Sequence, residues 1–102
     1  MIISVIADYE SEWYKVFIEK VVISFTGEKV LDLSRHPGNN WKKKDEARIQ
    51  DIEDSHLVIV CNNWQDNADV RHDLTEALNR KKDIFIEHDG KFVSFYTYNA
   101  RI

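Results

Sequence analysis

Two short apolar runs on either side of one helical segment constrain the fold of this chain most strongly. The runs cover residues 56–61 and 84–86, and a polar loop and a segment with helical spacing lie between them. Runs rich in Val and Ile are typical of strands buried on both faces, and a crossover of this length returns the second strand parallel to the first. Residues 51–87 therefore predict a strand-helix-strand unit. Ligands bind beyond the carboxyl ends of such strands, which places the expected site at residues 61–73.

The flanking segments extend this unit in both directions. Apolar or alternating patterns predict strands at residues 2–7 and 29–33, and helical spacing predicts helices after Ser11 and at residues 41–53. In the first of these helices, the predicted buried face carries Trp13, Val16, Phe17, Val21 and Phe25.

The second half of the chain has clear element boundaries. Val70, Leu74, Ala77 and Leu78 form a regular apolar helical stripe ahead of a fourth strand at residues 83–87. The dipeptide Asp89-Gly90 is a strong hairpin signal, so residues 91–98 are predicted to form an antiparallel edge strand.

These elements predict one α/β domain that spans residues 1–102. Right-handed crossovers place helices on both faces of the sheet, which gives a three-layer, flavodoxin-like sandwich with a mostly parallel sheet in the order 2-1-3-4-5. The order reverses between the first and third strands. Asp8 and Tyr9 are then expected to face residues 61–64 across that crevice.

Charge and composition exclude several classes of function. The net charge is −4 and the pI is about 5.5, and the basic stripe that a nucleic-acid or membrane surface needs is missing. Cys61 is the single cysteine, so an internal disulfide is impossible, and a cytoplasmic location is expected. The glycine patterns of dinucleotide and P-loop sites are missing, and the four His have no ligand-like spacing. We therefore expect no metal and no cofactor.

Asp73 is the residue that points most directly to chemistry. It lies about 80° from the centre of the apolar stripe of its helix, at the border of the buried face. In the first turns of a helix, the dipole favours an ionised carboxylate. Such a group can attack an anomeric carbon or stabilise an oxocarbenium-like centre. On spacing alone, Asp73, Asp69 and Asp66 can equally serve to complement the helix N-terminus.

The sequence of this region resembles the core of the nucleoside 2-deoxyribosyltransferase-like group. Residues 51–60 resemble the family's aspartate-leucine-valine-valine strand, and residues 73–86 resemble its acidic helix and the strand that follows. When Ala77 is matched to the alanine of that helix, Asp73 falls on the nucleophilic glutamate and Asp66 near the loop aspartate that orients the nucleoside. The loop around Trp64 also resembles that of Toll/interleukin-receptor-like (TIR) domains, whose enzymatic members cleave NAD. Both resemblances imply cleavage or transfer at an N-glycosidic bond.

The other candidate residues belong to the same crest of the sheet. Trp64 is a candidate platform for a base, and Asn62 and Asn63 are candidate hydrogen-bond donors to the ligand. Four further candidates lie in the loops after the first two strands: Asp8 and Tyr9 for a sugar hydroxyl, and Arg35 and His36 for a phosphate. After the third strand, Asp69 or Asp66 is a candidate to assist Asp73.

Two functions remain open from the sequence. The first is an enzyme acting on a nucleoside, nucleotide or NAD-like ligand, in which a second subunit completes a small pocket, so a homo-oligomer is expected. The second is a non-catalytic module of the same fold that senses a nucleotide or binds a protein through the aromatic segment of residues 92–98. In either case, neither nucleic acid nor a membrane is expected as a partner.

Overall fold

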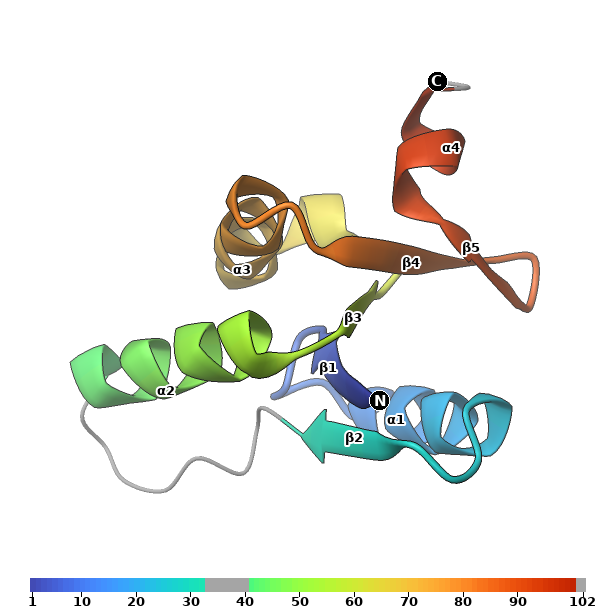
Figure 1. Ribbon diagram of the computed structural model, residues 1–102, viewed down its shortest axis with the longest axis horizontal. Coiled ribbons are helices and arrows are strands. Elements are labelled where there is room, and N and C mark those ends of the chain that lie inside the picture. Colours follow the sequence, from blue (N-terminus) through green and yellow to red (C-terminus); the bar gives the residue numbers. More distant parts are fainter. Residues whose placement is uncertain (33–40, 101–102) are drawn as a thin grey trace.

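The computed structural model describes residues 1–32 and 41–100 and has the predicted parallel sheet at its centre (Figure 1). Its strands, in the order β2-β1-β3-β4-β5, are β1 (Ile2–Ile6), β2 (Lys29–Asp32), β3 (Leu57–Val60), β4 (Asp83–His88) and β5 (Lys91–Ser94). Each neighbouring pair is parallel except β4 and β5. The predicted fold class and strand order are confirmed.

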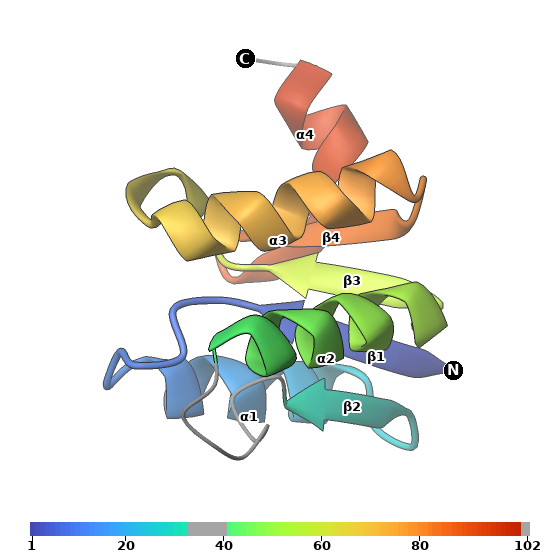
Figure 2. The same cartoon turned by 90° about the vertical axis from the view of Figure 1, so that its left-hand side faces the viewer.

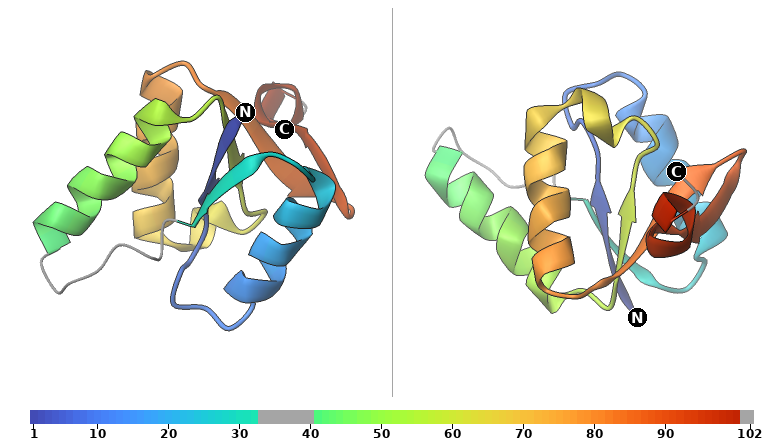
Figure 3. Two further views of the ribbon diagram at one scale, coloured as in Figure 1. Left: turned by 60° about the horizontal axis from the view of Figure 1, so that its bottom comes forward. Right: turned by 90° about the horizontal axis from the view of Figure 1, so that it is seen from above.

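Helices cover both faces of the sheet. Figure 2 shows α2 (Trp41–Asp54) and α3 (Ala68–Asn79) side by side on one face, and Figure 3 shows α1 (Tyr14–Ser24) on the other. The short α4 (Phe95–Ala100) packs at the β4–β5 edge. No helix within the described ranges is long and apolar enough to cross a membrane.

The sheet centre is buried because its strands carry apolar side chains on both faces. Every residue of β3 is buried, as are residues 3–6 of β1. Ile52 from α2 and Leu74 from α3 contribute to the same core. The hairpin after β4 has positive φ angles at both Asp89 and Gly90, as a two-residue turn of this sequence requires.

The predicted last strand is wrong in its second half. Residues 91–94 pair with β4, but residues 95–100 form α4. The alternating aromatic residues favour an edge strand, whereas the helix buries Phe95 to 3% exposure and places its ring 5.8 Å from that of Trp64. Phe92 and Val93 are also partly buried against the core, so most of the predicted aromatic interface is internal packing.

The predicted buried face of α1 is also partly wrong. The buried residues of this helix are Tyr14, Phe17 and Val21, while Val16 is 64% exposed. Apolar residues occur on every side of α1, so spacing alone did not identify the buried side. The positive φ of Gly27 agrees with the predicted end of this segment.

Candidate functional site

Asp73 lies at the predicted crest of the sheet, and its carboxylate is enclosed. Residue 73 is in the second turn of α3 and is only 1% exposed. The helix starts where it does because the Asn67 side chain accepts hydrogen bonds from the backbone N–H groups of Asp69 and Val70, at 2.9 and 3.1 Å. This cap fixes the first turn of α3. An Asn directly before an apolar helical stripe is a sequence signal for such a cap.

Two side chains from other elements bind one oxygen of Asp73. The Nε of Arg48, in α2, donates to Oδ2 at 3.0 Å, and the hydroxyl of Tyr9, in the loop after β1, donates to the same oxygen at 3.2 Å. The guanidinium carbon of Arg48 lies 6.0 Å from the centre of the Tyr9 ring, and Arg48 also pairs with Asp45. The cluster Tyr9–Arg48–Asp73 thus joins the β1 loop, α2 and α3.

The second oxygen of Asp73 is different. Oδ1 is buried and has no hydrogen-bond partner among the described residues. The Nδ1 atom of the exposed His72 lies 3.6 Å from it, beyond hydrogen-bond distance. Oδ2 is therefore held by two hydrogen bonds, whereas Oδ1 accepts none from the described residues.

Burial and charge act in opposite directions on this cluster. Burial raises the pKa of the Asp73 carboxyl above its ordinary value, although Arg48, Tyr9 and His72 act to lower it. Burial and the neighbouring Asp73 charge also raise the pKa of Tyr9, so its phenol stays protonated and donates. Desolvation lowers the pKa of Arg48, but the charges and hydrogen bond of Asp73, Tyr9 and Asp45 together have the larger effect, so the pKa is raised.

The raised pKa of Asp73 gives a testable dependence of stability on pH. A group whose pKa is higher in the folded than in the unfolded state adds its full stability below the unfolded value, about 3.9 for Asp, and loses it as the pH rises through the folded value. Asp73→Asn removes this titration. We expect the free energy of unfolding of the wild type to fall relative to that of the variant as the pH rises above about 4. Urea titrations at several pH values measure this difference in unfolding free energy. A difference that grows in favour of the wild type as the pH rises would contradict the raised pKa of Asp73.

A separate cavity opens beside Tyr9. Its volume is about 430 Å³, and its walls include Tyr9, Glu10, Glu12, Tyr14 and Lys15. This volume is in the range of small-molecule sites. Asp73 does not line this cavity, but Tyr9 belongs to its wall and also binds Asp73 through the hydroxyl. Tyr9 is therefore the residue that links the cavity to the carboxylate.

The structure brings some of the predicted residues together and leaves others apart. Asp8 is half-buried in the β1 loop, where its Oδ1 accepts from the backbone N–H of Glu10 at 3.2 Å. Asp66 and Asp69 are exposed, and no hydrogen bond between either side chain and the cluster is among those described. Arg35 and His36 lie outside the described residues.

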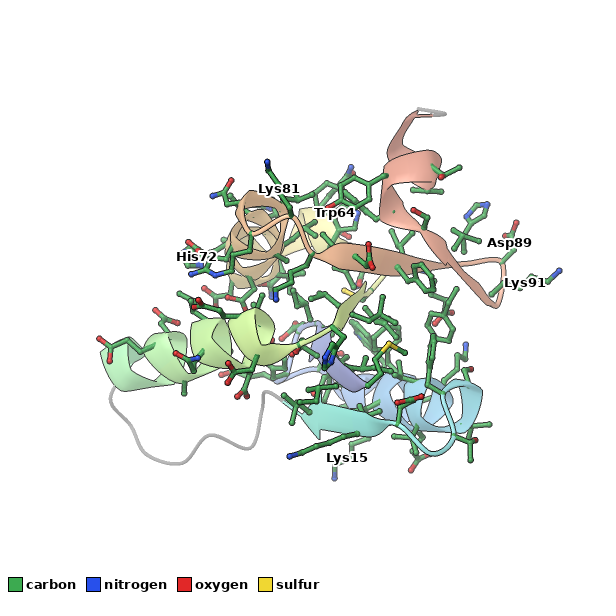
Figure 4. All side chains as sticks on the ribbon, viewed as in Figure 1. Lys15, Trp64, His72, Lys81, Asp89 and Lys91 are labelled. Atoms are coloured by element: carbon green, nitrogen blue, oxygen red, sulfur yellow. The ribbon has the colours of Figure 1, made fainter. Side chains whose placement is uncertain are left out.

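The three candidate residues after β3 differ in their exposure. Asn62 and Asn63 are exposed, whereas Trp64 is half-buried against Phe95 of α4. Figure 4 shows Trp64 beside α3 and Lys15 on the opposite side of the molecule, at α1. Trp64 is therefore a packing residue, and its role as a base platform stays a prediction.

Two further observations concern residues that the sequence left ambiguous. Cys61 is buried, and burial raises the pKa of its thiol to about 11, which keeps it protonated at neutral pH. Within the described part of the chain, no group of three or more His, Cys, Asp or Glu is placed to hold a metal ion.

The partner of Asp73 that the sequence analysis missed is Arg48. It is only 8% exposed, in a helix whose other charged residues gave no reason to single it out. A signal was nevertheless present, because Arg48 precedes the fully buried Ile52 by four residues and so shares its face of α2. An arginine on the buried face of a helix requires an acidic partner.

Comparison of the sequence with protein-family models gives no match, and comparison with curated proteins gives none.

Proposed function

We propose that this protein binds a nucleoside, nucleotide or NAD-like ligand at the carboxyl end of its sheet and cleaves or transfers at the N-glycosidic bond. Asp73 is the reacting carboxylate in this proposal. The observation that supports it is the asymmetry of that carboxylate, which has Oδ2 bound by Arg48 and Tyr9 and Oδ1 buried without a hydrogen-bond partner in the part of the chain that the structure describes. Buried polar atoms are rarely left unpaired, and a reactive role is one reason for an exception.

The chemistry follows from what each oxygen can do. Arg48 counters the burial of Asp73 and favours its ionised form, and the two hydrogen bonds to Oδ2 fix the plane of the carboxylate. A lone pair of Oδ1 attacks C1′ of the sugar, and the electron pair of the broken C1′–N bond leaves with the base, which takes up a proton from solvent. Water, or a second base, then displaces the carboxylate from C1′.

The surrounding residues have supporting roles in this proposal. The cavity of about 430 Å³ beside Tyr9 provides the space for the ligand. Because Oδ1 is covered, the ligand has to expose it on binding, and Tyr9, which lines the cavity and donates to Oδ2, connects the cavity with the carboxylate. The exposed Asp66 and Asp69 are assigned to the sugar hydroxyls.

A second candidate is a non-catalytic module that senses a nucleotide or binds a protein. It is favoured by the enclosure of Asp73, since a carboxylate with 1% exposure beside a buried arginine also serves to tie α2 to α3. In this alternative the cavity beside Tyr9 binds the ligand and no bond is broken.

Incubation with deoxynucleosides and with NAD distinguishes the two candidates. Free base, separated by chromatography, is expected for the enzyme. If isothermal titration shows binding of the same compounds while no base appears at high protein concentration, the sensing module is the correct function.

A further inference from the structure

A small groove lies between α1 and the carboxyl ends of two neighbouring parallel strands. Its volume is about 140 Å³, and the strand ends contribute Cys61 and Asn62, directly after β3, and Glu87, near the end of β4. Lys20 and the apolar side chains of Trp13, Val16 and Phe17 complete its lining. Figure 3 shows α1 on the face of the sheet opposite to α2 and α3, so the groove is separate from the Asp73 cluster. It lies where ligands bind in sheets of this type.

The polar groups of the groove have hydrogen-bonding capacity that the protein does not use. The Nζ of Lys20 donates to Oε1 of Glu87 at 3.0 Å, and the Glu87 side chain is only 17% exposed. An ammonium group carries three donors and a carboxylate has two oxygens, so this pair can bind further partners of both charges. The exposed side chain of Asn62 makes no hydrogen bond within the part of the chain that the structure describes.

The apolar part of the groove is open to solvent. Trp13 is 36% exposed and Val16 is 64% exposed, whereas Phe17 beside them is buried. An apolar cavity of about 150 Å³ is large enough to hold benzene. The groove therefore has room for one small aliphatic group, and it is much smaller than the site of a nucleoside.

We propose that this groove binds a free α-amino acid with an aliphatic side chain. The α-carboxylate accepts hydrogen bonds from Lys20 and Asn62, and the α-ammonium donates to Glu87. The aliphatic side chain lies against Trp13 and Val16. No bond is made or broken here, so the inference does not depend on the reaction proposed at Asp73.

The spacing of the ion pair selects an amino acid among small charged molecules. Because the charged atoms of Lys20 and Glu87 are 3.0 Å apart, a ligand that binds both has to carry its own opposite charges side by side. An α-amino acid does so, since both groups are attached to one carbon atom. A peptide carries them at opposite ends of its chain, and a carboxylic acid or an amine has only one of them.

Titration of the full ¹⁵N-labelled chain with L-valine, followed by NMR, tests the proposal. The side-chain N–H signals of Trp13 and Asn62 are expected to shift, with a dissociation constant of about 1 mM for so small a ligand. The compound 3-methylbutanoate lacks the ammonium group and 2-methylpropylamine lacks the carboxylate. Each is expected to bind about 10-fold more weakly or less, because one charge of the Lys20–Glu87 pair then has no counterpart. These comparisons use the wild-type chain alone.

Two variants test the assigned residues. Glu87→Gln and Lys20→Met are each expected to raise the dissociation constant for L-valine about 10-fold or more. Glu19→Gln and Lys15→Met are the matched controls, because both residues are exposed on the same helix and neither lines the groove, and they are expected to leave binding unchanged. No shift at up to about 20 mM L-valine, well above the expected constant, overturns the proposal. It is also overturned if 3-methylbutanoate binds as tightly as L-valine, or if Glu87→Gln binds L-valine like the wild type.

Discussion

Arg48→Met is expected to lower the free energy of unfolding by about 3 kcal/mol at neutral pH, which is a large loss for a domain of this size. The reason is that the variant leaves the Asp73 carboxylate buried without its opposite charge, while Met replaces most of the volume of the Arg side chain. Urea denaturation measures the loss. Arg71→Met is the matched control, because Arg71 is exposed, and it is expected to change stability by less than about 0.5 kcal/mol.

The effect of Arg48→Met is also expected to depend on pH. Without Arg48, the pKa of Asp73 rises further, so acid protonates the isolated carboxyl more readily and removes the buried charge. The difference in the free energy of unfolding between wild type and Arg48→Met should therefore become smaller as the pH falls. Replacing both charges, in Arg48→Met with Asp73→Leu, should cost less than Arg48→Met alone. A difference in unfolding free energy that does not change with pH would contradict the assignment of the buried ion pair.

Asp73→Asn is expected to reduce the rate of base release by about 10³-fold or more, as for removal of a reacting group. The amide is a weak nucleophile, but its oxygen still accepts hydrogen bonds from Arg48 and Tyr9, so the fold is expected to be retained. Circular dichroism checks that the variant is folded. Asp83→Asn, at the exposed start of β4, is the matched control and is expected to keep full activity.

The acid limb of the pH dependence of kcat/KM tests the role of Asp73 independently. In the proposed reaction only the ionised carboxylate attacks C1′. Because burial raises the pKa of Asp73, kcat/KM should rise with pH along a limb displaced to higher pH than that of an ordinary Asp. Arg48→Met should displace the limb further. A rate loss in Asp73→Asn no greater than in Asp83→Asn would show that residue 73 has no chemical role.

The sheet was predictable because the sequences of its strands fit few other structures. Continuous Val and Ile runs fit buried parallel strands, and Asp89-Gly90 fits one kind of turn, so the strand order and the closing hairpin could be predicted. Residues 95–100 were not predictable in the same way, because alternating aromatic residues favour a strand. Only the tertiary contact of Phe95 with Trp64 makes the helix the better way to bury that ring.

The candidate site was predictable in position but not in its contacts. The sequence placed Asp73 and Tyr9 at the same crest of the sheet, and in the structure the Tyr9 hydroxyl lies 3.2 Å from the Asp73 carboxylate. Arg48 was missed because a contact across 25 positions depends on how α2 packs against α3. The enclosure of Asp73 has the same origin, since no local pattern describes what a neighbouring helix covers.

The mass of the protein, quenched in acid during reaction with a deoxynucleoside, tests the central proposal most directly. A covalent step at Asp73 predicts a wild-type chain heavier by one deoxyribosyl group, located at residue 73 by peptide mapping, and an unmodified Asp73→Asn chain. A wild-type chain of unchanged mass from which no base is released, or base released equally by Asp73→Asn, would contradict it.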